Sequence, residues 1–216
     1  MPEEINYKDE IESNHKKDAV RRELFKKHGY DTEKERGFII EKSLPLSGKI
    51  LEVGTGKGHF AIELAKKGYK LTSVDVSAED QRIARLNLAY CGFENFVELK
   101  TENAESMSFK DDSFNAVFLV NTLHHLKNPF KVLSELIRIT SLEGKLIISD
   151  FSKQGFDALD KIHASEGTVH EVGKVKLSDI ECHLLSKGFR IEKFSSQLQE
   201  VLVIRFGNTF SFDLFA

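Results

Sequence analysis

The stretch LEVGTGKGHF, residues 51–60, decides the fold of this chain. Gly54, Gly56 and Gly58 follow an apolar run that contains a single carboxylate, Glu52. A strand that ends in a glycine turn and leads straight into a helix brings backbone N–H groups and a helix N-terminus to the carboxyl edge of a sheet. The stretch therefore predicts a ligand site at a strand, turn and helix junction.

The residue types of this turn indicate the charge of the ligand. A dinucleotide fingerprint of the form GxGxxG requires glycine at position 59, where the chain has His59. Glu52 would repel a pyrophosphate, whereas it suits a ligand with positive charge, such as an amino-acid ammonium. The residues disfavour a nicotinamide-dependent oxidoreductase, which stays open as an alternative.

Short apolar runs alternate with helical stretches beyond this turn, which is typical of a parallel sheet covered by helices. The runs predict a Rossmann-like, doubly wound α/β sheet of about seven strands, mostly parallel, with an antiparallel C-terminal strand and helices on both faces. VFLV and LIIS are apolar throughout, which places their strands centrally. Predicted strands are 49–53, 70–76, 96–100, 115–121, 145–151 and a hairpin of 190–196 with 200–206; predicted helices are 59–67, 79–91 and one opened by Asn128 and Pro129.

The flanking segments predict the domain organisation. Residues 1–44 read as an N-terminal helical cover, with helices over 6–28 and from a capping box of Thr32 and Glu35. Residues 45–216 read as one ligand-binding domain. Its segment 151–177 lacks a clear period and is expected to be an irregular insert that serves as a substrate lid. Ser178 and Glu181 are expected to cap a last helix.

Composition limits the partners. With 31 Lys and Arg against 34 Asp and Glu, the formal net charge is −3, which gives no general reason to expect nucleic acid. No apolar run is long enough for a membrane span, and the two cysteines form no CxxC pair, so a cytoplasmic protein is expected. The phenylalanines near the C-terminus predict either packing on the domain itself or a homodimer contact; they are Phe206, Phe210, Phe212 and Phe215.

Four blocks in order resemble a known family. Residues 52–58 resemble motif I, E/D-x-G-x-G-x-G, of class I S-adenosylmethionine-dependent methyltransferases. Asp75 closes the second strand at the family's spacing, and 101–126 and 143–151 resemble its next two blocks. The resemblance covers about residues 45–150 and is to the methyltransferase type 11 subgroup, which includes quinone-biosynthesis-type enzymes acting on small molecules.

The resemblance implies S-adenosylmethionine as cofactor and S-adenosylhomocysteine as product. Glu52 would orient the turn or receive the ammonium, and the turn would hold the methionine part. Asp75 would bind the ribose hydroxyls, and Val76 would pack on the adenine. Asn103 replaces the family's usual Asp, and its amide oxygen would accept from the adenine amino group. The implied cofactor-binding set is Glu52, Gly54, Thr55, Gly56, Asp75, Val76, Asn103, Ala104, Glu105 and Asn121.

The acceptor side is less defined. His124 and His125 follow the fourth strand, where a neutral imidazole could remove a proton from an acceptor or simply line the pocket. Asp150 ends the fifth strand and is a candidate substrate contact. No metal site is expected, because adjacent side chains on extended backbone point apart and Asn121 stands where a carboxylate ligand would be needed. The insert residues His163, Glu166, His170 and Glu171 fit no metal motif, and Tyr7, Tyr30 and Arg36 are candidate lid contacts.

The predicted function is transfer of a methyl group from S-adenosylmethionine to a small-molecule acceptor by direct in-line displacement. No NPPY-like sequence follows the fourth strand, where NTLH stands, and no cysteine there suits cytosine chemistry. A protein that binds S-adenosylmethionine or S-adenosylhomocysteine without turnover is the alternative.

Overall fold

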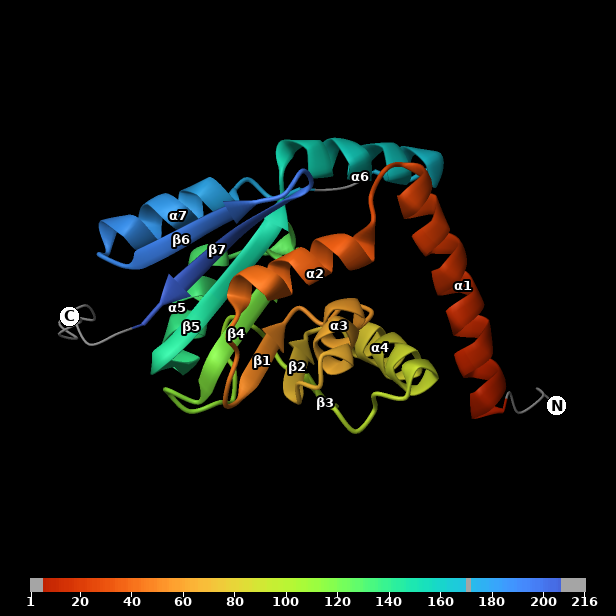
Figure 1. Cartoon of the computed structure of the whole chain (residues 1–216), viewed down its shortest axis with the longest axis horizontal. Coiled ribbons are helices and arrows are strands. Elements are labelled where there is room, and N and C mark those ends of the chain that lie inside the picture. The colour runs from red at the N-terminus through yellow and green to blue at the C-terminus, as the bar shows by residue number, and fades with distance from the viewer. Residues whose placement is uncertain (1–5, 170–171, 207–216) are drawn as a thin grey trace.

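The computed structural model describes residues 6–169 and 172–206. They form a seven-stranded sheet in the order β3-β2-β1-β4-β5-β7-β6 (Figure 1). Only β7 runs antiparallel to its neighbours, β5 and β6. The strand order reverses between β1 and β4, which makes a switch point where ligands bind in open α/β sheets.

The strands agree with the predicted ones to within one residue at each end, except that β5 begins at Thr140, five residues before the predicted start. The continuously apolar runs form β4 and β5, which lie in the middle of the sheet as predicted. The bounds are β1 Ile50–Val53, β2 Leu71–Asp75, β3 Val97–Thr101, β4 Phe114–Val120, β5 Thr140–Phe151, β6 Arg190–Ser195 and β7 Gln199–Arg205.

Helices cover both faces of the sheet. One apolar core joins α2, α3 and α4 to one face, and a second core joins α5 and α7 to the other. Alternate residues of a strand face opposite sides, so Ile50 faces the first core and Leu51 the second. The helices are α1 Tyr7–Lys27, α2 Thr32–Ser43, α3 His59–Lys66, α4 Ala78–Cys91, α5 Pro129–Ile139, α6 Lys153–Ser165 and α7 Leu177–Ser186, with a 3₁₀ turn, η1, at Leu123–His125.

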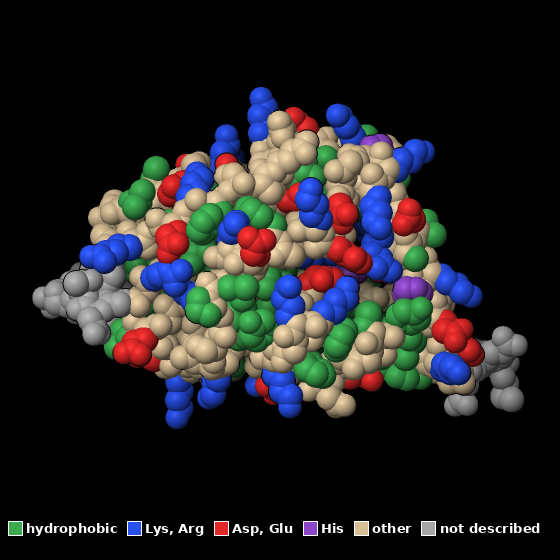
Figure 2. All heavy atoms as spheres, in the orientation of Figure 1, with side chains coloured by type: hydrophobic (Ala, Val, Ile, Leu, Met, Phe, Trp, Pro, Cys, Tyr) green, Lys and Arg blue, Asp and Glu red, His purple; other side chains and the backbone are tan. Residues whose placement is uncertain are grey.

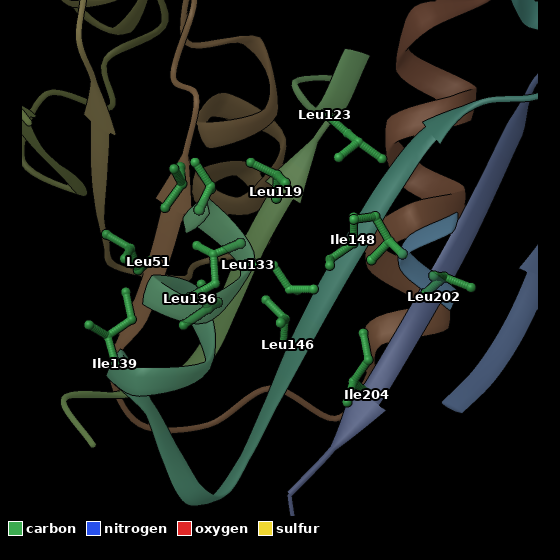
Figure 3. Packing of buried hydrophobic residues seen from close by; sticks show 14 of the residues in the cluster. Leu51, Leu119, Leu123, Leu133, Leu136, Ile139, Leu146, Ile148, Leu202 and Ile204 are labelled. Carbon is green, nitrogen blue, oxygen red and sulfur yellow. The ribbon is translucent and has the colours of Figure 1, made fainter. Parts of the chain in front are cut away.

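The second core consists mostly of aliphatic side chains from both layers (Figure 3). Leu133, Leu136 and Ile139 on α5 lie against Leu119 of β4 and Leu146 of β5, and all are at most 2% exposed. Burying each such side chain contributes about 1.5–3 kcal/mol. This packing holds β1 and β4 rigidly side by side, and therefore fixes the strand ends that carry polar residues.

α1 attaches differently from the other helices. None of its residues is buried, and it lies beside α4 at the edge of the molecule (Figure 1). Its contacts with the neighbouring helices are polar or aromatic: Asn14 Nδ2 donates to Asn87 Oδ1 at 2.7 Å, and the His15 and Tyr90 rings stack with centroids 3.5 Å apart. Residues 7–27 and 32–43 are therefore helical, and α1 rests on α4 whereas α2 packs on the sheet itself.

Some local predictions are wrong. The insert is not irregular, because Lys153–Ser165 form α6, opened by Ser152 Oγ, which accepts from Gly155 N at 3.1 Å. α2 begins with Asp31 as its cap, and Glu35 is instead buried, where it accepts a hydrogen bond from Ser196 Oγ. α7 begins at Leu177, ahead of the predicted Ser178. His170, Glu171, Phe210, Phe212 and Phe215 lie outside the described residues.

The surface carries both signs of charge. Figure 2 shows Lys and Arg interspersed with Asp and Glu over the visible face. Within residues 6–169 and 172–206, none of the helices is both long and apolar enough to cross a membrane.

Candidate functional site

A cavity of about 790 Å³ lies at the carboxyl edge of the parallel strands. Its volume is within the range of ordinary small-molecule sites. All ten residues predicted to bind the cofactor line it: Glu52, Gly54, Thr55, Gly56, Asp75, Val76, Asn103, Ala104, Glu105 and Asn121.

Strand order arranges these residues in a row. Asn103, Gly54 and Asn121 follow β3, β1 and β4, and Asp75 is the last residue of β2. The four strands are neighbours in the order β3-β2-β1-β4. Neighbouring strands are about 4.8 Å apart, so the row is roughly 14 Å long. The site therefore fits an elongated ligand that lies across the strand ends.

The glycine turn requires glycine at its first two positions. Gly54 and Gly56 have φ angles of 89° and 48°, in the region that side chains disfavour. A Cβ on Gly54 would lie 2.2 Å from Thr122 Oγ1, whereas one on Gly56 would meet nothing within 4 Å. Gly56 thus presents open backbone beside the cavity, and Gly54 permits close packing against the residue after Asn121.

Glu52 lies at the end of β1 and is 1% exposed. Ser73 Oγ donates to its Oε2 at 2.5 Å. Burial raises the pKa of Glu52 to about 8, an effect that the Ser73 hydrogen bond and the charge of Arg36 reduce but do not cancel. A cation placed in the cavity would restore the ionised carboxylate.

Arg36 on α2 lines the same cavity, on the face of the sheet that Glu52 occupies. In the part of the chain that the structure describes, it makes no ion pair within 4.0 Å. Burial lowers the pKa of Arg36, and Glu52 and Tyr30 oppose that shift. A guanidinium and a carboxylate in one cavity are complementary to the two charges of an α-amino acid.

Asp75 lines the cavity and also accepts a hydrogen bond from the glycine turn. Its Oδ2 accepts from Gly56 N at 2.8 Å, and its Oδ1 accepts from Ser77 N at 3.0 Å. Each oxygen keeps a lone pair for a ligand hydroxyl. The next residue, Val76, is 72% exposed and lines the cavity, so it offers an apolar surface to a flat ring.

Asn103 uses, within the protein, part of the hydrogen-bonding capacity that was predicted to serve the ligand. Its Oδ1 accepts from Glu105 N at 2.9 Å and so closes the turn after β3. One lone pair on that oxygen remains for a donor. Glu105 is directed toward α5, where it accepts from Asn128 Nδ2 at 2.9 Å and pairs with Lys131 at 3.4 Å.

Asn121 ends the row. Its φ of 52° turns the chain sharply after β4, and Asn tolerates this conformation better than most residues. Its Oδ1 is buried and accepts no hydrogen bond from the described residues. Its amide also interacts with Tyr30, whose pKa burial raises to about 12 and whose hydroxyl accepts from Gln199 Nε2 at 3.1 Å. The unpaired oxygen predicts a ligand donor at this end.

The two histidines have different places. His124 is 3% exposed, and its Nδ1 lies 2.6 Å from Asp150 Oδ1, which also accepts from Phe151 N. His125 is exposed and lines the cavity, with its ring centroid 4.0 Å from that of His124. Neither His124 nor Asp150 lines the cavity, so the structure supports neither as a direct substrate contact there.

Comparison with known proteins agrees with this geometry. Residues 51–148 match the family model described as a methyltransferase domain. The ubiquinone biosynthesis O-methyltransferase of Xanthomonas axonopodis is 25% identical over 172 residues, which cover 76% of this chain and 71% of that protein. Over these residues the chain is similar to methyltransferases.

Solved structures share the fold of this chain. An S-adenosylmethionine-dependent methyltransferase from Aquifex aeolicus has a TM-score of 0.62 at 20% identity, covering 79% of this chain and 89% of that one. The [4+2]-cyclase SpnF has a TM-score of 0.64 at 15% identity, covering 80% of each chain. The chain spans 38% to 71% of the length of the curated relatives it matches.

The cavity has several features that suit S-adenosylmethionine. Glu52 and Arg36 suit the amino-acid part, Asp75 the ribose and exposed Val76 the adenine. The open side of Gly56 and the unpaired oxygen of Asn121 lie along the same row. The described residues contain no group of three or more His, Cys, Asp or Glu that could hold a metal ion.

Some residues of the site were missed or misplaced by sequence reasoning. The sequence predicts Arg36 only as a lid contact, because nothing in a single charged helix shows which side chain points inward, whereas the structure places it on the cavity wall. His59 lines the cavity and bonds Asp18 of α1 through Nε2 at 3.1 Å. Tyr7, in contrast, is 49% exposed and does not line the cavity.

Proposed function

We propose that this chain transfers a methyl group from S-adenosylmethionine to a small-molecule acceptor. The observation that carries the proposal is one cavity in which Glu52 and Arg36 lie together and Asp75 lies one strand further along. That spacing suits a zwitterionic amino acid joined to a nucleoside. The methyltransferase family match supports the same assignment.

The chain's own residues would bind and orient the cofactor. Arg36 would pair with the carboxylate and Glu52 with the ammonium, while the two oxygens of Asp75 would accept from the ribose hydroxyls. When bound, S-adenosylmethionine supplies a methyl group on a positively charged sulfur. The side-chain oxygen of Asn121 would accept a hydrogen bond from that end of the ligand. The second core beneath β1 and β4 keeps these groups in register.

We further propose that the acceptor atom bears a proton and lies beside His125. His125 is at the β4 end of the row, on the far side from Asp75, and it lines the cavity. His125 would accept the proton at a ring nitrogen. Asp150 accepts from Nδ1–H of His124 and fixes that ring, which packs against His125 and holds it in place.

The likeness to a [4+2]-cyclase gives a reason to test turnover separately from binding. Thermal unfolding with S-adenosylhomocysteine at a hundredfold excess over its dissociation constant should raise stability by about 2.7 kcal/mol, or about 5–11 °C. NADH at the same excess should leave it unchanged. A shift with NADH alone would contradict the assignment.

Transfer itself requires a labelled methyl group. The protein is incubated with methyl-tritiated S-adenosylmethionine and a library of phenols, hydroxylated acids and amines, and label is counted in each product. Label in a small-molecule product supports the proposal. A thermal shift without label in any product would leave a binding protein without turnover.

A further inference from the structure

A chain of buried polar side chains runs beneath the glycine turn from α4 to Glu52. Gln81 Nε2 lies 2.9 Å from Thr55 Oγ1, Thr55 Oγ1 lies 2.6 Å from Ser73 Oγ, and Ser73 Oγ lies 2.5 Å from Glu52 Oε2. The four side chains are 6%, 4%, 0% and 1% exposed in the same order. Water therefore does not replace any of these contacts.

The hydrogen bonds that join these four side chains can run in only one direction. Each hydroxyl has a single proton to donate. The amide nitrogen of Gln81 can only donate, so Thr55 Oγ1 accepts from it and has its own proton left for Ser73. Ser73 therefore accepts from Thr55 and donates to Glu52 Oε2. Every donor points toward Glu52, and Glu52 Oε2 has to act as an acceptor.

The position of any proton on Glu52 follows. A proton on Oε2 would oppose the Ser73 donor, so a neutral Glu52 carries its proton on Oε1. That oxygen accepts no hydrogen bond from the described residues, and Glu52 lines the cavity. Because burial raises the pKa of Glu52 to about 8, the carboxyl is mostly neutral near pH 7.

The charged neighbours of Glu52 come from several elements. Arg36 on α2 favours its ionised form, and Asp75 on β2 disfavours it. The other charged or titratable groups on the cavity wall are Lys57, His59, Asp80, Glu102, Glu105, His125 and Lys127. Glu52 and Ser73 are also direct register partners on parallel strands, so the sheet itself keeps their side chains together.

We propose that Gln81, Thr55 and Ser73 are positioning residues that hold Glu52 as a carboxylate acceptor, and that the ligand's ammonium displaces the proton of Oε1 into solvent. The O–H bond of Glu52 breaks, the proton passes to buffer, and an ammonium N–H donates to the resulting carboxylate. No oxidation or reduction takes place. The inference rests on the proposed binding of S-adenosylmethionine.

The expected size of the pH effect on ligand binding follows from the fraction of Glu52 that is ionised before binding. With a pKa of about 8, that fraction is about 1% at pH 6 and about a quarter at pH 7.5. Apparent affinity scales with the competent fraction, so the dissociation constant should fall more than tenfold over this interval. Nearly one proton should be released for each ligand bound at pH 6.5, and about half a proton at pH 8.

Calorimetric titration with S-adenosylhomocysteine measures both quantities, because heats in two buffers of different ionisation enthalpy give the number of protons released. Glu52→Gln should abolish both the pH dependence and the release. Methylthioadenosine, which lacks the amino-acid part, should bind the unmodified protein without releasing a proton.

The positioning of Glu52 by Thr55 and Ser73 is tested by removing single hydroxyl groups. Ser73→Ala removes the donor to Glu52, so proton release at pH 8 should rise from about half toward one. Thr55→Val should also raise the proton release at pH 8. Thr55→Ser, which keeps the hydroxyl, should release as many protons as the unmodified protein. Thr140→Val is the matched control: Thr140 is 1% exposed and donates to Leu136 O at 2.6 Å at the opposite edge of the sheet.

The outcomes are distinct. Failure of S-adenosylhomocysteine to bind at any pH would overturn the proposed function itself. Binding with a constant affinity and no proton release would overturn only the displacement at Glu52. Equal proton release by Ser73→Ala and Thr140→Val would show that the Ser73 hydroxyl does not position Glu52.

Discussion

Replacement of Asp75 by alanine tests the orientation of the cofactor. Asp75 accepts from Gly56 N and Ser77 N, at 2.8 and 3.0 Å, and each oxygen has capacity for one ribose hydroxyl. Hydrogen bonds to a charged group contribute about 1.5–3 kcal/mol each, and water recovers part of this in a cavity. Asp75→Ala should weaken S-adenosylhomocysteine binding by about 2–3 kcal/mol, which is roughly 30-fold to 150-fold in the dissociation constant.

Calorimetric titration gives the dissociation constant, and urea unfolding of each variant gives the accompanying loss of stability. Asp75→Asn keeps one acceptor oxygen and should lose less affinity than the alanine variant. Glu98→Ala removes an exposed carboxylate from β3, where it pairs with Lys100 at 3.2 Å, and should leave the dissociation constant unchanged. Unchanged affinity in Asp75→Ala would refute the proposed place of the ribose.

A second ligand separates contact with the ribose from loosening of the glycine turn. An S-adenosylhomocysteine analogue without the two ribose hydroxyls should bind the unmodified protein more weakly than the parent compound. On Asp75→Ala the two ligands should bind alike, because the hydroxyls have already lost their partner. Additive losses would show that Asp75 acts only on the turn.

Further predictions concern the other charged groups. Arg36→Met should weaken S-adenosylhomocysteine at least tenfold but leave methylthioadenosine, which lacks the carboxylate, unaffected; equal losses in competitive binding would contradict this. His125→Gln should lower turnover about a hundredfold at saturating cofactor and leave the S-adenosylhomocysteine affinity intact, whereas unchanged turnover would make His125 only a lining residue. Because the native pKa of Glu52 is about 8 against an ordinary 4.5, native protein binds more protons than unfolded protein between these values. Ligand-free stability should therefore fall as pH rises through that window, and Glu52→Gln should flatten the fall in urea unfolding.

The sheet was predictable because its signals are local and repeated. Apolar runs such as VFLV and LIIS can only be buried on both faces, so β4 and β5 had to be central. The strand end at Glu52, the glycine turn and Asp75 come from consecutive strand, turn and helix units, so their convergence follows from parallel topology. All ten predicted cofactor residues accordingly lie on one cavity wall.

Helix ends and the insert were less predictable, because several polar residues compete to cap each helix. Asp31 displaced the expected pair of Thr32 and Glu35, since Glu35 is buried where Ser196 donates to it. Residues 153–165 form a helix although their period is weak in the sequence. Its buried face, which includes Leu159 and Ile162, depends on neighbours far along the chain.

Local pattern was enough to specify a glycine turn at the end of β1, an acid at the end of β2 and a central pair of apolar strands, because backbone geometry and alternation act within a few residues. The partners of each polar side chain depended on chain segments distant in sequence. Folding placed Arg36 of α2 beside Glu52, gave Glu52 its donor Ser73, and turned His124 inward to Asp150 while His125 reached the cavity. Burial and pairing of these groups, which set their charge, arise only when the helices pack on the sheet.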